Sequence, residues 1–398
     1  MNKLISHIGL VLVCSLWFAP SAIAKQELGM RTATQVSKAY SLEQEDKLAD
    51  AIALLEKLKP TASYDQAYVA RMLGIYYWQA EQTEQAIKQL QIAVSTAAFT
   101  GEQGWQTERM LAELLLSEAK AEQALVHFNV LGKSAGSLDI PQEQVTNVWL
   151  NTARSHYLLQ QWKPLLTAIK QYHKLDSTPK LQPLSLQLSA ELQLSHLKSA
   201  IITSQKLLAL QPKNTMWWQQ LSALYMQTKQ YKLALATLVS AQRAGIEMPE
   251  SMQVSMAQLY AQQGIPEKSA HLYSELQVND ADIDTIIKQA THWQMAREWN
   301  SAQRSWQAAA RLNAKYYEQV SRLELQQGAF DAALMSLSKV KGISLQEKQI
   351  LQIRAYVGLK QYEAAKKLAQ AAHREKPSSQ TSDWLDYLDQ MTKSHKRL

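Results

Sequence analysis

The chain has 398 residues, with 42 Lys and Arg against 35 Asp and Glu and a formal net charge of +7. Hydrophobic residues make up 46% and charged residues 19%, which supplies a folded core and excludes a wholly disordered chain. The 12 Gly and 10 Pro are few for this length, so helices joined by short links are expected rather than strands joined by many tight turns. The positive surplus is small and dispersed, so it does not indicate a nucleic-acid partner.

Residues 1–24 have the organisation of a secretory signal peptide. Lys3 precedes an apolar run from Ile8 to Phe18, and Ala22-Ile23-Ala24 forms a small-residue cleavage site before Lys25. The alternative is an uncleaved membrane anchor, but the run is shorter than the ~20 residues that span a bilayer. We therefore expect an exported chain, periplasmic if the source is bacterial, with no stable membrane insertion after cleavage.

The single cysteine, Cys14, lies inside this predicted signal peptide. Val13 precedes it, where a lipoprotein signal would have a small residue, so we do not interpret Cys14 as a lipidation site. The mature chain is then expected to fold without disulfides, and it offers no thiolate for a metal site.

An internal repeat runs through the remainder of the chain. Two groups of apolar and small residues have helical spacing and are separated by a short turn, as expected for two antiparallel helices. The clearest example consists of Trp218, Leu221, Tyr225, Ala234, Leu238 and Ala241. A small residue opens each predicted second helix: Ala51, Ala86, Ala124, Ala200, Ala234, Ser269, Ala302, Ala333 and Ala365.

The intervals between these small residues are 35, 38, 76, 34, 35, 33, 31 and 32 residues. The interval of 76 is two units long, with a hidden unit near Leu165, so ten units are predicted. The two least regular units are those of residues 149–172 and 184–212. An irregular helical array without a strict repeat is the alternative interpretation.

This period and pattern resemble the tetratricopeptide repeat (TPR) family, in which a Pro often closes the unit, as Pro60, Pro212 and Pro377 would here. The resemblance implies an all-α fold: a right-handed superhelical solenoid of about ten TPR-like helix pairs over residues 25–377. Soft hinges are expected near 132–141 and 178–180. Residues 378–398 are predicted to form a capping helix and basic tail, with Ser382 or Asp383 as N-cap and Trp384, Leu388 and Met391 covering the last unit.

The sequence contains few signs of catalysis. It has no Gly-rich phosphate loop, no His-Glu-x-x-His and no nucleophile-elbow motif, and no two histidines lie four apart on one helix face. Trp218, Trp293 and Trp306 occupy packing positions of the repeat, which favours a core role over ligand stacking. We therefore expect no enzyme, no metal site and no cofactor.

A recurring surface on the first helices is the predicted interaction site. Repeat proteins of this kind usually bind a peptide or partner helix on the concave side, which the first helices line. Arginine among apolar side chains suits an acidic and apolar partner segment, because guanidinium pairs with carboxylates and stacks on aromatic rings; ordinary solvated arginines are the alternative. The residues are Tyr68, Arg71, Ile75, Trp78, Arg109, Arg154, Tyr157, Arg322, Leu325, Arg354 and Val357.

Export together with a solenoid that lacks catalytic groups predicts a periplasmic scaffold or adaptor that binds a protein or peptide. The Gln-rich, ten-unit organisation is similar to the periplasmic TPR proteins that accompany TonB-type systems, which implies a role beside a TonB–ExbB–ExbD complex in iron uptake. An assembly factor for an outer-membrane or cell-wall polymer or secretion machine is the alternative. A third hypothesis is an enzyme-associated sensor that binds a glycan on its tryptophans.

Overall fold

The computed structural model describes residues 27–276 and 282–395, and side chains as far as residue 393, so the predicted signal peptide lies outside the described residues. Within them all regular secondary structure is helical, with twenty-one α-helices, two short 3-10 helices and no strand. The all-α prediction is therefore confirmed. None of these helices is long and apolar enough to cross a membrane.

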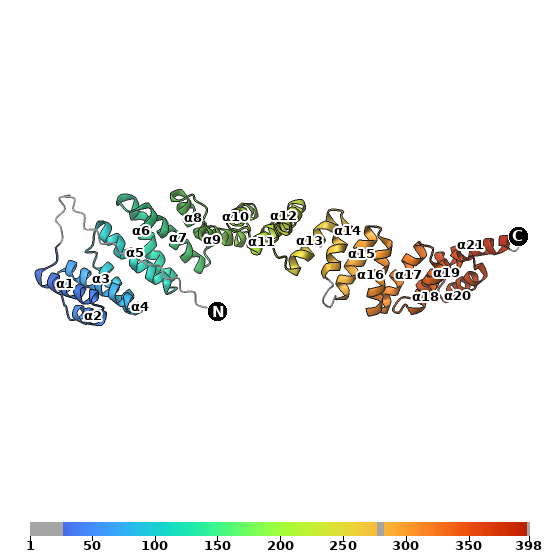
Figure 1. Ribbon diagram of the computed structural model, residues 1–398, viewed down its shortest axis with the longest axis horizontal. Coiled ribbons are helices and arrows are strands. Elements are labelled where there is room, and N and C mark those ends of the chain that lie inside the picture. Colours follow the sequence, from blue (N-terminus) through green and yellow to red (C-terminus); the bar gives the residue numbers. More distant parts are fainter. Residues whose placement is uncertain (1–26, 277–281, 396–398) are drawn as a thin grey trace. The chain divides into compact units, whose positions relative to one another are not determined.

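The chain divides into two compact units between Thr178 and Pro179. Figure 1 labels the helices of unit 1 from α1 to α8 and those of unit 2 from α9 to α21. That the links near 132–141 and 178–180 act as hinges stays a prediction. The helices of unit 1 are α1 (Met30–Gln44), α2 (Leu48–Glu56), α3 (Ser63–Gln79), α4 (Thr83–Ser95), α5 (Gly101–Ser117), α6 (Ala121–Ser134), α7 (Gln142–Leu158) and α8 (Trp162–Leu175), with η1 (Ala135–Ser137) after α6.

Unit 2 continues the same alternation of first and second helices. Its helices are α9 (Leu181–Gln193), α10 (Leu197–Leu210), α11 (Thr215–Gln227), α12 (Tyr231–Arg243), α13 (Glu250–Gln262), α14 (Pro266–Leu276), α15 (Ile283–Met295), α16 (Trp299–Leu312), α17 (Tyr317–Gln326), α18 (Phe330–Lys339), α19 (Leu345–Gly358), α20 (Tyr362–Glu375) and α21 (Ser379–His395), with η2 (Ala314–Tyr316) before α17.

Each odd-numbered helix from α1 to α19 pairs with the next helix to form a hairpin, numbered here 1 to 10. The nine small residues predicted to open second helices, and Leu165, near which the hidden unit is predicted, all lie on even-numbered helices and are 0% exposed. Leu165 is among them, so the irregular units of 149–172 and 184–212 are hairpins 4 and 5. The predicted ten-unit repeat is confirmed.

The turn inside each hairpin has one repeated conformation. A residue with positive φ precedes the buried position by five residues in all ten hairpins, and the N–H of the next residue donates back to a carbonyl of the first helix. In hairpin 6, Lys229 has φ 59° and Gln230 N donates to Tyr225 O over 2.8 Å, which is a Schellman helix end. The ten positive-φ residues are Asp46, Glu81, Ala119, Gln160, Ser195, Lys229, Gly264, Arg297, Gly328 and Lys360.

Within each unit, the second helix of one hairpin packs on the first helix of the next, so the core continues from hairpin to hairpin. Buried tyrosines at equivalent places, Tyr77, Tyr225 and Tyr260, fill the space left by the small residues, as predicted. The hydroxyl of Tyr225 accepts a hydrogen bond of 2.9 Å from Gln205 in the preceding hairpin. Aromatic rings therefore join successive repeats as well as filling them.

Three local expectations need correction. In hairpin 6 the buried indole is Trp217, at 7% exposure and one turn before Leu221, whereas Trp218 is half-buried at the edge and donates to Pro212 O over 2.8 Å. Gly132 belongs to α6 and not to a link. A Cβ added at Gly132 would lie 3.0 Å from Trp149, so the glycine leaves room for the indole to pack against the helix.

The third correction concerns the last helix. It begins at Ser379 rather than near Ser382 or Asp383. Ser378 and Thr381 bond reciprocally, with Ser378 N donating to Thr381 Oγ1 over 3.0 Å and Thr381 N to Ser378 Oγ over 3.3 Å, so the helix is capped four residues earlier. Leu388 is 0% exposed. Together with Trp384, also on α21, it packs against α20, as a capping helix requires.

Candidate protein-interaction surface

The first helices can be aligned on the positive-φ residue that ends each of them. In α3 four predicted residues lie 13, 10, 6 and 3 positions before Glu81: Tyr68, Arg71, Ile75 and Trp78. Steps of three, four and three keep them on one face of the helix. Tyr64, four residues before Tyr68, extends the same row. We call these five residues the α3 stripe.

The N-terminal half of the α3 stripe is an aromatic cluster around one arginine. The guanidinium carbon of Arg71 lies 5.9 Å from the ring centroid of Phe99, in the loop between α4 and α5. Tyr64 meets the same ring edge to face at 5.6 Å and lies 6.3 Å from the ring of Tyr68. The charge of Arg71 is therefore presented among rings, an arrangement that favours both stacking and carboxylate pairing.

The C-terminal half of the stripe is exposed and apolar. Trp78 is 40% exposed, Ile75 is half-buried, and Tyr40 of α1 is 55% exposed in the register of Ile75. Tyr76, next to Ile75 in the sequence, is 2% exposed. Burial, with the charge of Glu43 and two neighbouring tyrosines, raises its pKa to about 12. Tyr76 therefore belongs to the hydrophobic core and not to the exposed half of the stripe.

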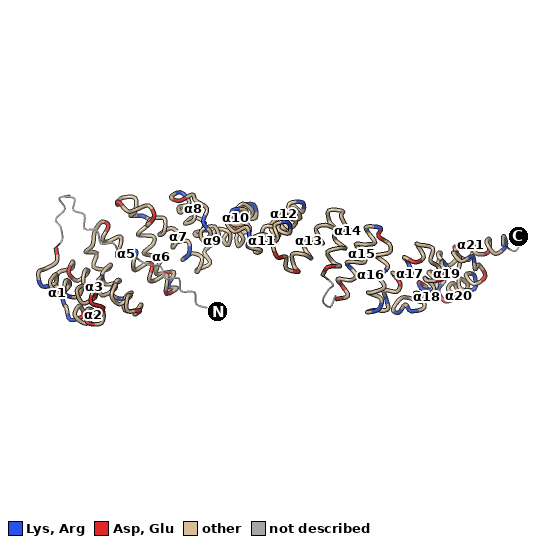
Figure 2. Tube along the Cα trace, in the orientation of Figure 1, with Lys and Arg blue, Asp and Glu red and all other residues tan. Residues whose placement is uncertain are grey.

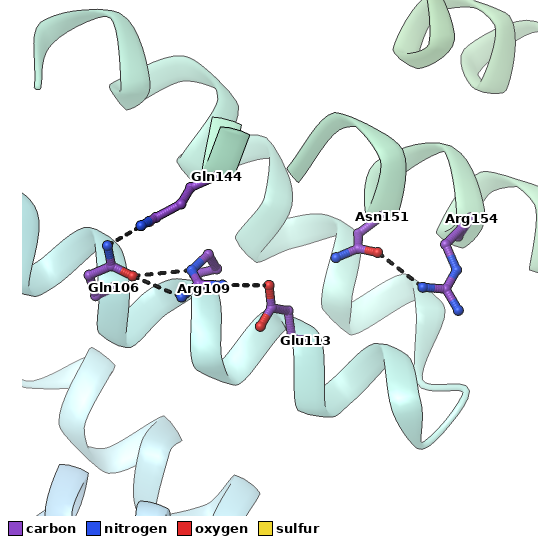
Figure 3. Close-up of polar contacts among 6 residues, drawn as sticks. All are labelled: Gln106, Arg109, Glu113, Gln144, Asn151 and Arg154. Carbon is purple, nitrogen blue, oxygen red and sulfur yellow. Dashed lines mark hydrogen bonds and ion pairs between the residues drawn. The ribbon is translucent and has the colours of Figure 1, made fainter. Parts of the chain in front are cut away.

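Arg109 lies in the same register as Arg71, but its side chain is bonded along its own helix (Figure 3). Its Nε and Nη2 donate to Gln106 Oε1 at 3.1 and 3.0 Å, and its Nη1 forms an ion pair with Glu113 at 2.9 Å. Gln106 Nε2 in turn donates to Gln144 of α7 over 2.7 Å. This chain of bonds joins α5 to α7 and partly neutralises Arg109.

Arg154 of α7 is exposed, and its Nη1 donates to the neutral amide oxygen of Asn151 over 3.3 Å (Figure 3). Tyr157, one turn further on, is 42% exposed and meets Trp162 edge to face at 5.8 Å. Arg154 occupies the register of Ile75 and Tyr157 that of Trp78. Unit 1 therefore presents seven predicted residues on the first helices of hairpins 2, 3 and 4: Tyr68, Arg71, Ile75, Trp78, Arg109, Arg154 and Tyr157.

Arg322 and Arg354 belong to unit 2, on α17 and α19. Arg322 forms ion pairs with Glu318 at 2.7 Å and with Glu347 of α19 at 2.9 Å, so it also links neighbouring hairpins. Arg354 is exposed. Both share the register of Arg154, one turn from that of Arg71 and Arg109. The five arginines thus recur on one helix face but at two different positions.

Three residues of this surface were missed by sequence reasoning. Tyr64 could have been found, because its spacing from Tyr68 continues the helical row. Tyr40 is likewise in register with Ile75 once the turns are aligned. Phe99 left no signal, since it lies in a loop whose path over Arg71 depends on tertiary packing.

The described residues offer little chemistry outside this surface. A pocket of about 470 Å³ lies between the ends of α4 and α6 and the start of α5, and Glu108 on its wall bonds His127 Nδ1 over 2.7 Å. A second pocket of about 450 Å³ lies between α19 and α20. Within the described ranges, three or more His, Cys, Asp or Glu side chains nowhere gather in a way that could hold a metal ion. The absence of enzyme activity stays a prediction.

Comparison with known proteins finds no matching family model and no matching curated protein. Among solved structures, the chain is similar to a tetratricopeptide repeat protein from Parabacteroides merdae ATCC 43184, with 14% identity, a TM-score of 0.34, and coverage of 62% of this chain and 99% of that one. It is also similar to a mutant of the protein MamA, with 15% identity, a TM-score of 0.38, and coverage of 47% of this chain and 96% of that one. These low scores support no functional argument, so the fold assignment rests on the ten hairpins themselves.

Proposed function

We propose that the protein is an exported, periplasmic TPR-type scaffold whose first-helix face in unit 1 binds a segment of another protein. The proposal rests on the α3 stripe, in which Arg71 is set among Tyr64, Tyr68 and Phe99 and is followed by the exposed Trp78. Large exposed aromatic side chains and arginine are the residues that contribute most to protein interfaces.

The chemistry of this face fits a partner segment that combines carboxylates with apolar side chains. Arg71 and Arg154 can pair with carboxylates, while Ile75, Trp78 and Tyr157 can bury apolar groups of the partner. The ion pair of Arg109 with Glu113 makes that position a weaker anion site and a structural link between α5 and α7.

A triple variant tests this surface. Arg71→Glu, Arg109→Glu and Arg154→Glu together should abolish capture of the partner in a crosslinking pull-down from periplasm, followed by mass spectrometry. Lys88, Lys163 and Lys170, exposed on the second helices of unit 1, provide the matched control when changed to Glu. Equal capture by the arginine variant and the wild type would reject the surface.

The compartment is tested separately. We expect the mature chain to begin at Lys25 and to fractionate with periplasmic proteins; N-terminal sequencing of the purified protein checks both the cleavage site and the export. Retention of residues 1–24 in a membrane fraction would contradict the proposal and favour an uncleaved anchor.

The first partner to test is a TonB–ExbB–ExbD complex, because the exported, Gln-rich, ten-unit organisation resembles TPR proteins that accompany such systems. Reciprocal pull-down with tagged TonB should then recover this chain, and iron-siderophore uptake should fall in its absence. Recovery of polymer-assembly or secretion components instead would replace this partner with the alternative machine while leaving the binding face intact.

A further inference from the structure

Hairpins 5 and 6 carry a marked excess of positive charge. Between Asp176 and Glu247 the chain contains seven Lys and Arg but one acidic residue, Glu191 (Figure 2). Hairpins 3 and 4 provide a contrast, since residues 101–175 contain seven basic and seven acidic residues. Lys180 precedes hairpin 5. Six basic residues follow it, five within the two hairpins and Lys213 in the link between them. We call these six the basic surface: Lys198, Lys206, Lys213, Lys229, Lys232 and Arg243.

The acidic residue of these hairpins does not face the basic surface. All six basic side chains belong to exposed residues. Glu191 is 3% exposed and its Oε1 accepts a hydrogen bond of 2.8 Å from Gln187, so its carboxyl group points into the core. A partner can therefore meet these charges without first displacing an acidic side chain of the same hairpins.

Aliphatic side chains are interleaved with the lysines on the second helices. On α10, Lys198, Ile202, Lys206 and Leu210 follow one another at intervals of four residues, and Ile202 and Leu210 are 56% and 41% exposed. On α12, Leu233 is 47% exposed beside Lys232. The surface therefore offers apolar contacts as well as charge.

We infer that the basic surface of hairpins 5 and 6 is a second docking site, for an acidic polypeptide segment that also carries apolar side chains. The aliphatic groups between the lysines would have no counterpart on a sugar–phosphate backbone. Lys213 and Lys229 lie at opposite ends of α11, which has 13 residues and is therefore about 20 Å long. A flexible chain can follow charges around both ends of a hairpin, whereas a flat bilayer contacts one side.

The site lies in unit 2 and on second helices and turns, so it is independent of the first-helix face proposed above. Its test uses the full chain with Arg71→Glu and Arg154→Glu, which removes the two carboxylate-pairing arginines of the first-helix face in unit 1. The probe is a fluorescein-labelled synthetic peptide of alternating Glu and Leu, with a Gln and Leu peptide as the uncharged comparison. Anisotropy should show binding of the Glu peptide alone. The affinity should fall as NaCl is raised from low to physiological concentration, because the Debye length contracts to about 8 Å at 0.15 M.

The decisive variant combines Lys198→Glu, Lys206→Glu and Lys232→Glu, which should weaken binding of the Glu peptide about tenfold or more. The matched control changes Lys88, Lys163 and Lys170 to Glu. Lys163 occupies the same position in its hairpin as Lys198, two residues before the buried residue (Leu165 or Ala200) that opens the second helix. This control should change the affinity less than about twofold. Circular dichroism checks that both variants remain helical.

Equal weakening by both triples would show non-specific attraction and overturn the inference. So would failure of the chain with Arg71→Glu and Arg154→Glu, whose basic surface is intact, to bind the Glu peptide. Phosphatidylglycerol vesicles and single-stranded DNA are tested in the same way. If either binds more strongly than the peptide, and the Lys198, Lys206 and Lys232 triple loses that binding, the surface belongs to a different class of partner and the inference is overturned.

Discussion

Lys229 adopts a left-handed backbone conformation, φ 59°, five residues before Ala234, whose side chain is 0% exposed between the helices of hairpin 6. The two residues act together: the left-handed turn reverses the chain, and the small side chain lets the second helix approach the first. The same pair of features, a left-handed residue and a fully buried one at the same spacing, occurs in every one of the ten hairpins. The repeat is therefore defined by its turn as much as by its core.

Glycine substitution tests the turn. Most of the ten left-handed positions are occupied by side chains that carry a steric cost there, whereas hairpin 7 has Gly264 at φ 77°. Lys229→Gly should stabilise the protein by about 0.5–1 kcal/mol, and Gly264→Ala should destabilise it by about 1 kcal/mol. A Cβ at Gly264 would meet no atom within 4 Å, so the loss reports backbone strain alone. Urea denaturation measures both; equal stabilities would contradict the shared turn.

The small residue is tested by enlarging it. Ala234→Leu should destabilise unit 2 by about 1–3 kcal/mol, because the added atoms force the helices of hairpin 6 apart. Ala236, two residues later on α12, is exposed, and Ala236→Leu should change the stability by less than about 0.5 kcal/mol. Chemical denaturation compares the two variants. A tolerated leucine at Ala234 would show that close helix approach is not required.

The two arginines of Figure 3 should differ in their effect on binding. Arg154→Gln removes an exposed charge bonded to a neutral amide, and should weaken partner binding about fivefold or more. Arg109→Gln removes a charge already paired with Glu113, and should weaken it less than about twofold. Titration of the captured partner measures both. The reverse order would show that the Glu113 pair opens on binding.

Glu324 should make the stability of unit 2 depend on pH. It is 4% exposed on α17, and burial raises its pKa above the ordinary 4.5, although Gln303 donates to its Oε1 over 3.2 Å. Above pH 4.5 the folded protein therefore binds more protons than the unfolded chain. The stability that protonated Glu324 contributes is fully present below pH 4.5 and is lost as the pH rises through the pKa of Glu324 in the folded protein.

Glu324→Gln removes this dependence, because the amide stays neutral. The variant should have a higher urea midpoint than the wild type at pH 7, and the two midpoints should converge near pH 4. Glu375→Gln, at an exposed residue of α20, is the control for loss of a negative charge. The urea midpoint of the wild type should decrease from pH 4 to pH 7 relative to that of Glu324→Gln. A constant difference between the two midpoints would refute the assignment.

The repeat could be predicted from sequence because its signals are local. Small residues at a regular spacing mark the second helices, and even hairpin 4, which has Leu165 in place of a small residue, was found from the doubled interval. The cap of α21 was placed wrongly because Ser382 and Asp383 stand directly before Trp384, whereas the reciprocal bonds of Ser378 and Thr381 begin the helix one turn earlier.

The interaction surface could be predicted only in part. Helical spacing placed Tyr68, Arg71 and Trp78 on one face of α3, and the structure has them in that register. The partners of Arg109 could not be predicted, because long side chains choose among several carboxylates and amides according to rotamer and neighbouring helix. Their pairing decides how much charge the surface keeps.

Site-specific photo-crosslinking tests the central claim, that the first-helix face of unit 1 holds another protein. A benzophenone amino acid is placed at Trp78 in one full-length protein and at Val126, 62% exposed on the second helix α6, in another. After irradiation in cells, the Trp78 protein should yield a discrete crosslinked polypeptide and the Val126 protein none. No crosslink at Trp78, or the same crosslink at both positions, would contradict the account.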